Sequence, residues 1–335
     1  MDEQDPSSLL LLGTRFWEAK ALLAAVELGV FAILSESPLS CEELAQQAGL
    51  NGRGAADFLD VLVSLKLLAR AEGRYANTPR AERFLVPDSP SYIGGALELA
   101  NSRLYPVWAK LTDALRTGQP QNEAKEAPDY YDNLTGHPDR LKSFMRAMTG
   151  LSLHASNALA ANFPWNEFAS FVDVGGAQGV LAVQVAAAHE HLVGASFDLP
   201  PVGPIFNAYV SSFGLQHRLR FQAGNFLLEP LPNADVIIMG HVLHNWNLEQ
   251  KLMLIRKAYD AVPPSGALIV YEALIDDERQ KNAFGLLMSL NMLLVTTGGF
   301  VFTGADCCSW MRAAGFRETR VEHLDGPDWA VIATK

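Results

Sequence analysis

Cysteine and basic residues are scarce in this chain of 335 residues. It has three cysteines, Cys41, Cys307 and Cys308, which are too few for a disulfide framework, and the adjacent pair lacks the spacing of zinc ligands. We therefore expect a reducing, cytoplasmic setting. Lysine and arginine number 26 against 37 acidic residues, and the net charge of −11 argues against a surface that coats nucleic acid.

A basic leader and a long apolar run are also missing. The N-terminal segment carries Asp2, Glu3 and Asp5 where a signal peptide would have basic residues. Residues 9–12 are apolar, but Arg15 ends that run far short of the roughly 20 residues of a membrane span. We therefore expect no membrane partner. With 49% hydrophobic and 19% charged residues, the composition is typical of a globular protein of about two domains.

The N-terminal third predicts a small helical domain that ends in a β-hairpin. Ser40 and Glu43 have the spacing of a capping box, and a later helix is expected over 54–68, followed by a wing-like strand at 74–79. That helix has few basic residues and two opposing acids, whereas a DNA-recognition helix needs several donors. We interpret residues 1–110 as a winged-helix-like dimerisation domain and keep DNA binding as a less favoured alternative.

The rest of the chain predicts a connection and then an α/β domain. The polar stretch 117–140 predicts a loop and 141–161 a helix, so we interpret 111–165 as a linker and connecting helix. Alternating strands and helices over 166–335 predict a Rossmann-like, mostly parallel, doubly wound sheet. Strands are expected at 170–174, 193–198, 218–222, 235–240, 267–272, 317–323 and 329–334.

A glycine-rich turn begins this second domain. It comprises Asp173, Gly175, Gly176 and Gly179, and it lies between the first predicted strand and an apolar helix at 180–188. Glycines there let backbone N–H groups approach a ligand closely. A dinucleotide fingerprint would require glycine at positions 177 and 180, where the chain has alanine and valine. The spacing instead predicts a turn that binds S-adenosylmethionine (SAM).

Asp198 ends the next predicted strand, 25 residues after Asp173. A carboxylate at that position can accept hydrogen bonds from both hydroxyls of a ribose. The residue therefore predicts a nucleoside ligand without saying which one, because an NAD site uses the same contact.

Two motifs resemble known families. The turn resembles the first motif of class I SAM-dependent methyltransferases, D-V-G-G-G-x-G, from which Ala177 departs. The segment Val242-Leu243-His244-Asn245-Trp246 resembles the V-L-H-D-W signature of small-molecule O-methyltransferases of the caffeate, hydroxyindole and bacterial antibiotic-tailoring type. That resemblance extends from about residue 15 to the C-terminus. It implies a homodimer, SAM as cofactor with S-adenosylhomocysteine as product, and no metal.

The resemblance also implies roles for individual residues. His244 would be the general base, which suits an imidazole that titrates near neutral pH, and Glu272 would orient it. Asn225 stands where the family has an acid that contacts adenine, so we expect a weaker contact there. Further implied cofactor contacts are Leu199, Gly224, Phe226, Gly240 and His241. Implied acceptor contacts are Phe144, Met148, Met288, Asn291 and Met292.

The chain departs from the family pattern at two acids. Asn245 replaces the aspartate after the base, and Val301 replaces the glutamate of a G-G-x-E-R-T segment. We hypothesise a less strongly polarised base, or an acceptor hydroxyl that is already acidic. Two alternatives stay open, namely SAM-binding chemistry without methyl transfer, such as pericyclisation or hydroxylation, and a ligand-sensing regulator. His241 and His244 have the spacing of a metal pair, but no third ligand is evident nearby in the sequence.

Overall fold

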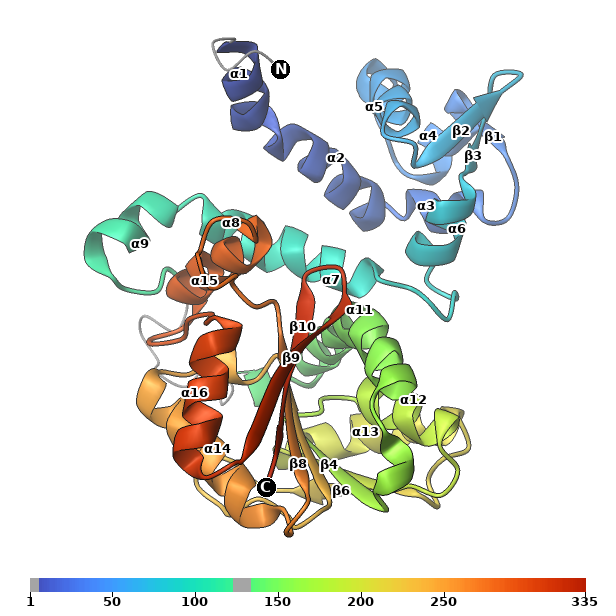
Figure 1. The fold of residues 1–335 in the computed structure, drawn as a ribbon. Helices are drawn as coiled ribbons and strands as arrows, with labels where there is room; N and C mark the ends of the chain where they lie inside the picture. Colours follow the sequence, from blue (N-terminus) through green and yellow to red (C-terminus); the bar gives the residue numbers. More distant parts are fainter. Residues whose placement is uncertain (1–5, 123–133) are drawn as a thin grey trace. The chain divides into compact units, whose positions relative to one another are not determined.

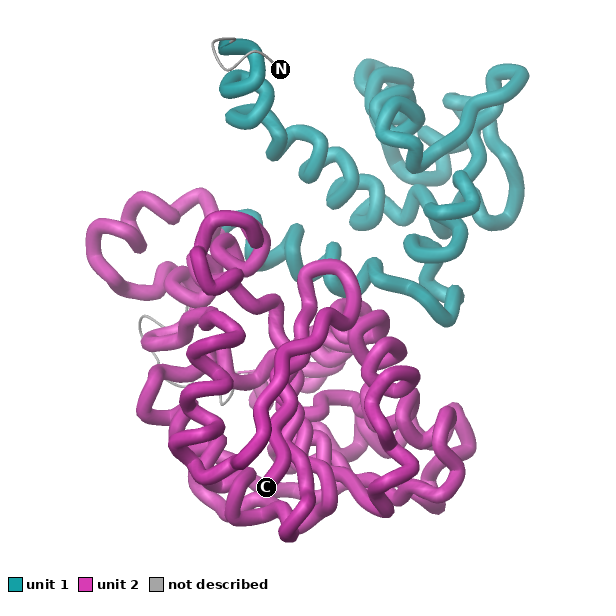
Figure 2. Tube along the Cα trace, viewed as in Figure 1, with its two compact units in different colours: residues 1–106 teal, residues 107–335 magenta. Residues whose placement is uncertain are grey.

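The computed structural model describes residues 6–122 and 134–335. They form two compact units, which meet in the sequence between Pro106 and Val107 (Figure 2). Within the described ranges, no helix combines the length and the apolar character needed to cross a membrane.

The first unit is a set of short helices around a three-stranded antiparallel sheet, with strand order β1-β3-β2 among the described residues. Its core contains Phe31, Leu44, Leu59, Leu62 and Tyr75. The elements are α1 (Pro6–Thr14), α2 (Phe16–Glu27), α3 (Val30–Leu34), β1 (Leu39–Ser40), α4 (Cys41–Gln47), α5 (Gly52–Ser64), β2 (Leu68–Ala71), β3 (Arg74–Asn77), α6 (Pro79–Leu85), α7 (Gly94–Leu99) and the π-helix η1 (Ala100–Leu104). The short helix α8 (Tyr105–Trp108) spans the boundary, and its last two residues, including Trp108, belong to the second unit.

Local signals account for where these helices begin. The predicted capping box is confirmed, because the Ser40 hydroxyl accepts from the Glu43 N–H at 3.2 Å and the Glu43 carboxylate accepts from the Ser40 N–H at 2.8 Å. The predicted helix over 54–68 is wrong at both ends, since α5 begins at Gly52 and ends at Ser64. Lys66 adopts a left-handed φ of +58°, which stops the helix before β2 begins.

The second unit contains a seven-stranded sheet, as far as the chain is described, with order β6-β5-β4-β7-β8-β10-β9. All neighbours are parallel except β10, which runs antiparallel to both β8 and β9. Its elements are α9 (Leu111–Thr117), α11 (Pro138–Asn162), η3 (Trp165–Glu167), β4 (Ser170–Val174), α12 (Val180–Ala188), β5 (Val193–Asp198), η4 (Pro200–Val202), α13 (Gly203–Ser212), β6 (Leu219–Ala223), β7 (Val236–Gly240), η5 (Leu243–Asn245), α14 (Leu248–Ala261), β8 (Ala267–Glu272), α15 (Ala283–Val295), α16 (Gly304–Ala314), β9 (Glu318–Asp325) and β10 (Asp328–Thr334).

Helices cover both faces of this sheet (Figure 1). Helices α14 and α16 pack on one face, and α11, α12 and α13 pack on the other, so that the sheet separates two apolar cores. This arrangement confirms the predicted Rossmann-like α/β fold. The carboxyl ends of β4, β5, β7 and β8 meet at one edge of the sheet, which brings the residues that follow them together.

The predicted loop over 117–140 is wrong at its C-terminal end. Pro138 is the first residue of α11, a position where proline is tolerated because the first turn of a helix has no partner for its N–H. Residues 123–133 of that predicted loop lie outside the described part of the chain.

Candidate active site

The glycine-rich turn leaves β4 and leads into α12. Gly179 has φ +93° at the N-cap of α12, and a Cβ there would lie 2.6 Å from the ring of Phe206. At Gly176 a Cβ would lie 2.6 Å from the Oδ2 atom of Asp173 and equally near the Ser196 hydroxyl. Because nothing larger than glycine fits at either position, the backbone of the turn runs tightly over the strand ends.

Backbone hydrogen bonds tie this turn to β5. The Gly175 N–H donates to the Phe197 carbonyl at 2.9 Å. The Asp198 carboxylate accepts from the Ala177 N–H at 3.0 Å and from the Leu199 N–H at 2.7 Å. Ala177 adopts a left-handed φ of +53°, which is uncommon for a residue with a Cβ. The departure from glycine at this position therefore costs local strain, which the bond to Asp198 offsets in part.

Two buried carboxyl groups lie beneath the turn. Burial raises the pKa of Asp198 to about 6. Burial, together with the nearby Asp198, raises the pKa of Asp173 to about 8. A buried pair of this kind resists double ionisation, so at neutral pH Asp198 carries the charge and Asp173 is mainly protonated.

The segment after β6 reaches the same edge. The Gly224 N–H donates to the Asp198 carbonyl at 2.9 Å. The Asn225 side-chain oxygen accepts from the Leu227 N–H at 2.9 Å, so one of its hydrogen bonds is made within its own turn. The Phe226 ring meets Trp246 edge to face, with the ring centroids 5.8 Å apart.

The segment after β7 carries two histidines. Gly240 has no room for a Cβ, which would collide with the ring of Tyr271. His241 adopts a left-handed φ of +53°, and its N–H donates to the Tyr271 carbonyl at 3.0 Å. This geometry turns the chain into η5, the short 3₁₀ turn that carries His244.

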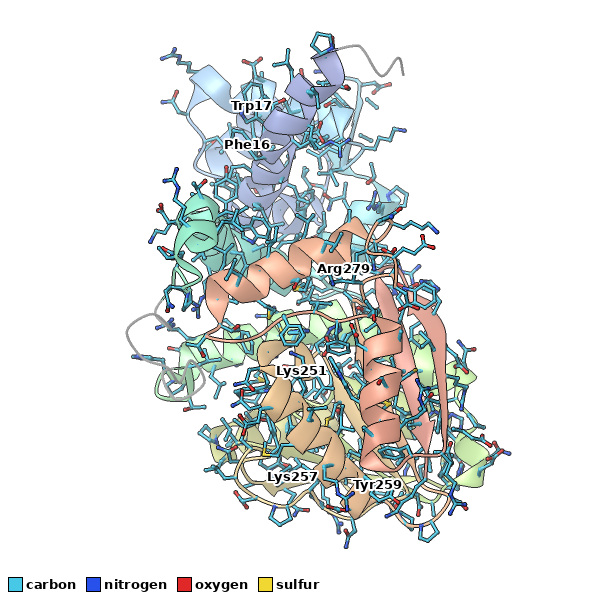
Figure 3. The ribbon with its side chains drawn as sticks, turned by 60° about the vertical axis from the view of Figure 1, so that its left-hand side comes forward. Phe16, Trp17, Lys251, Lys257, Tyr259 and Arg279 are labelled. Atoms are coloured by element: carbon cyan, nitrogen blue, oxygen red, sulfur yellow. The ribbon has the colours of Figure 1, made fainter. Side chains whose placement is uncertain are left out.

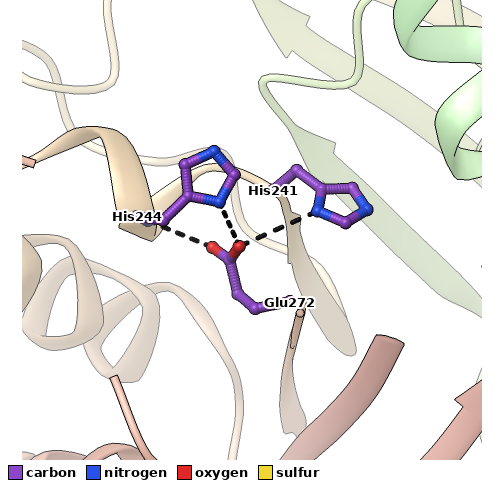
Figure 4. A group of neighbouring side chains, drawn as sticks. All are labelled: His241, His244 and Glu272. Atoms are coloured by element: carbon purple, nitrogen blue, oxygen red, sulfur yellow. Dashed lines mark hydrogen bonds and ion pairs between the residues drawn. The ribbon is translucent and has the colours of Figure 1, made fainter. Parts of the chain in front are cut away.

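Glu272 and His244 are in direct contact (Figure 4). The fully buried Glu272 accepts from the His244 Nδ1 atom and, through its other oxygen, from the His244 N–H at 3.1 Å. Burial favours the neutral acid, but the His244 imidazole and N–H, together with His241, outweigh burial and lower the pKa of Glu272. An ionised carboxylate only accepts, so Nδ1 carries the proton and the outward-facing Nε2 is left as the acceptor.

His241 lies on the other side of the same carboxylate. Its Nδ1 is 3.8 Å from Glu272 Oε2, and its Nε2 is 3.5 Å from Asp328 Oδ2 on β10, which is an ion-pair distance rather than a hydrogen bond. Burial alone would lower the pKa of His241, but the carboxylates of Asp328 and Glu272 raise it. The two imidazoles therefore share the carboxylate of Glu272, and Asp328 adds a second carboxylate on the side of His241.

The sequence shows no third potential ligand close to the two histidines, but the fold brings one beside them. Glu272 lies within 4.8 Å of both, although it follows His244 by 28 residues. Its contact with the His244 Nδ1 atom is a hydrogen bond, whereas a metal ion between them would hold each atom at about 2.0–2.2 Å from itself and push the two apart. The geometry of the three groups favours proton chemistry over metal ligation.

The predicted acceptor contacts lie on two helices of the second unit. On α15, which packs against η5, the Asn291 oxygen accepts from the Trp108 indole at 3.0 Å, and the Asn291 amide lies 3.9 Å from the Met288 sulfur. Met292, on the same helix, is buried. On α11, Phe144 packs in a small apolar cluster that includes Ala177 of the turn, and Met148 is half-buried.

The residues at the two departures from the family pattern serve the local structure. The Asn245 amide donates to the carbonyls of His241 at 3.0 Å and Val242 at 3.3 Å, a bond that an aspartate could not donate. Val301 is buried, and its N–H donates to the Ser289 hydroxyl at 3.2 Å. Asn245 and Val301 therefore leave the site without the two carboxylates that the family pattern has at these positions.

Sequence reasoning missed three residues at this edge, namely Trp108, Lys251 and Asp328. Only Lys251 had a signal: it shares the apolar helical spacing of Leu254 and Ile255, where a lysine is out of place. Trp108 and Asp328 are distant in sequence from the motifs they approach, and nothing local marks them.

Comparisons with known proteins match both parts of the chain. An O-methyltransferase domain matches residues 108–317, and an O-methyltransferase dimerisation domain matches residues 10–87. The tetracenomycin polyketide synthesis 8-O-methyl transferase of Streptomyces glaucescens is 42% identical over 333 residues, covering 98% of this chain and 97% of that protein. The N,N-dimethyltransferase OxyT of Streptomyces rimosus is 37% identical over 331 residues, covering 98% and 96%.

A solved structure matches both units. The crystal structure of human N-acetylserotonin methyltransferase in complex with SAM has a TM-score of 0.91 and 28% identity, and the match covers 100% of this chain and 99% of that chain. The domain match alone spans more than half of the residues. This chain therefore belongs to the O-methyltransferase family and carries a dimerisation domain ahead of its methyltransferase domain.

Proposed function

We propose that this enzyme transfers the methyl group of SAM to a hydroxyl of a small aromatic or polyketide-like molecule, with His244 as the general base. The observation that carries the proposal is the contact between His244 Nδ1 and the buried, ionised Glu272. That contact leaves the other ring nitrogen free to take the hydroxyl proton as the oxygen attacks. Glu272 then stabilises the imidazolium that results.

The cofactor is SAM, and the glycine-rich turn fits it. Gly176 and Gly179 let the backbone of the turn pack tightly against Asp173, Ser196 and Phe206 at the strand ends, and Asp198 places a charged acceptor where a ribose would bind. Bound SAM supplies a methyl group activated by a positively charged sulfur. We assign Gly175, Leu199, Gly224, Asn225, Phe226, Gly240 and His241 to the same site, because all of them lie at the strand ends around Asp198 and Glu272.

The local environment of the base indicates which hydroxyls it can use. Asn245 and Val301 contribute no carboxylate to the base. The Glu272 carboxylate that contacts His244 also lies near His241, so the two imidazoles share it. A shared carboxylate polarises the base less than a dedicated one. The proposed acceptor is therefore a phenol, whose hydroxyl is acidic enough to react with a modest base, held by Met288, Asn291, Met292, Phe144 and Met148.

The acceptor class is tested by incubating the protein with SAM and a panel of polycyclic phenols, simple phenols, aliphatic alcohols and aromatic amines. We expect S-adenosylhomocysteine and a product heavier by one methyl group with the polycyclic phenols first, as read by mass spectrometry. Methylation of amines alone would replace the oxygen assignment. Product without S-adenosylhomocysteine would indicate the non-methylating alternative, and neither product with any acceptor would contradict the proposal.

The affinity for the cofactor is expected to fall as the pH drops through about 6. Asp198 must be ionised to accept from the ribose, and its pKa of about 6 leaves roughly a tenth of it ionised at about pH 5. Calorimetry with S-adenosylhomocysteine should therefore give an affinity about tenfold weaker at about pH 5 than at about pH 7.5. The Asp198→Asn variant should bind weakly at both pH values, and a parent affinity independent of pH would contradict the role of Asp198.

We also propose that the protein is a homodimer assembled through residues 1–110. The dimerisation-domain match lies in this region. Helix α1 and the start of α2 expose Leu9, Leu10, Leu11 and Trp17, each more than 60% accessible, and such a patch is typical of an interface.

A further inference from the structure

Lys251 is a completely buried lysine on α14 (Figure 3). Its helix buries Leu254, Ile255 and Ala258 along the same face, in the core between α14 and the sheet. Lysine is rarely buried without a specific partner, since the ammonium group loses its hydration. The proton transfer assigned to His244 and Glu272 does not use it.

The contacts of the ammonium group point at the turn that carries the base. Lys251 Nζ donates to the Trp246 carbonyl, which directly follows η5. It also lies 3.4 Å from the centroid of the Phe300 ring and 5.7 Å from that of Phe302. A cation over an aromatic face is stabilised most strongly when it is desolvated, as this one is.

The segment beneath the ammonium group packs on the same turn. A Cβ on Gly299 would lie 2.5 Å from the His244 carbonyl, and one on Gly298 would lie 3.1 Å from Asn247. Lys251 therefore binds both partners of this contact, the turn through Trp246 and the segment through Phe300. Without the Lys251 ammonium group, the His244 turn and the Phe300 segment are no longer joined through it and can move apart.

The charge of Lys251 also reaches the base. Burial lowers its pKa to about 8, and attraction to Glu272 works against that effect. Other ionisable groups around Glu272 are His244, His241 and the Cys307 thiol of α16, whose pKa burial raises well above the usual value. Below about pH 8 the ammonium is charged, so it adds a positive charge near the carboxylate that contacts both imidazoles.

We propose that Lys251 is a positioning residue for methyl transfer: its ammonium group fixes the His244 turn against the Phe300 segment and places a positive charge near the Glu272 carboxylate that accepts from the imidazole. The inference rests on the proposed role of His244. It goes further because it assigns a function to a buried cation on a helix outside the motifs.

The test replaces Lys251 by methionine, which fills a similar volume without charge. We expect kcat to fall about tenfold with KM for the acceptor unchanged, and the pKa of His244, followed by NMR of the protein with bound S-adenosylhomocysteine, to rise. The melting temperature should stay equal or increase, because a buried lysine with a lowered pKa destabilises the fold below that pKa. Arg256→Met removes a 59%-exposed cation from the same helix and should change none of these.

The results of this test distinguish a failure of the role proposed for Lys251 from a failure of the proposed function. A lower melting temperature with an unchanged pKa of His244 would show a purely structural lysine and overturn the proposal, as would an unchanged kcat. If the parent methylated no acceptor, the proposed function would fail, whereas the shift in the pKa of His244 would still report whether Lys251 acts on that imidazole.

Discussion

Exchange of His244 for asparagine is expected to lower kcat by about 10²–10⁴-fold, the usual contribution of a positioned general base. The asparagine amide can still donate to Glu272, so the turn should keep its shape while the site loses the group that takes the proton. The measurement is the initial rate of S-adenosylhomocysteine formation at saturating acceptor. Calorimetry should show cofactor affinity close to that of the parent, because the Asp198 contacts are untouched.

Glu272→Gln provides the companion test. Glutamine removes the charge that favours Nδ1–H and stabilises the imidazolium, so we expect a large but smaller loss of kcat than for His244→Asn. Glu318→Gln, in an exposed position on β9, is the matched control and should react at the parental rate. Parental rates for both His244→Asn and Glu272→Gln on an accepted substrate would contradict the base assignment.

Gly179→Ala is expected to weaken cofactor binding about 5–140-fold. The new methyl group meets the ring of Phe206 at 2.6 Å and also faces a φ of +93°, so the turn must move to relieve it. Overpacking of this kind costs about 1–3 kcal/mol, and each 1.4 kcal/mol lost from binding is tenfold in affinity. The measurement is calorimetric titration with S-adenosylhomocysteine, together with a thermal melt.

Gly214→Ala separates the two causes. Gly214 has a φ of +70° but nothing within 4 Å of its Cβ direction, so it tests backbone strain alone. We expect a lower melting temperature with parental affinity there. If Gly179→Ala and Gly214→Ala both bound S-adenosylhomocysteine with the parental affinity, the turn would not hold the cofactor.

Much of the second unit could be predicted from local patterns. Strands β4, β5 and β8 have the predicted bounds, because a buried parallel strand is a short run of apolar, β-branched residues between turn signals. The predicted ends of the helices were less accurate than those of these strands. The end of α5 depends on one left-handed residue, Lys66, and the start of α11 depends on Pro138 entering a first helical turn rather than a loop.

The site was predictable where a strand end marks it. Asp198 and Glu272 are the last residues of β5 and β8, and the glycine-rich turn follows β4, so topology alone brings them to one edge. The burial of Lys251 and the approach of Asp328 to His241 could not be read in this way. Both depend on which helix or antiparallel strand packs beside the edge, a long-range choice that short motifs do not encode.

Because β10 runs antiparallel to its neighbours, residues from the C-terminal hairpin reach one side of the candidate site. Trp329 pairs with Glu272 across the antiparallel ladder, so Asp328 arrives from the amino end of a strand through the hairpin after β9. The residues proposed to contact the methyl donor lie instead in and beside the loops after β4 and β5, where the Ala177 N–H donates to Asp198. Changes in the length or sequence of that C-terminal hairpin are therefore expected to alter the surroundings of His241 and the proposed base while leaving the proposed nucleoside contacts unchanged.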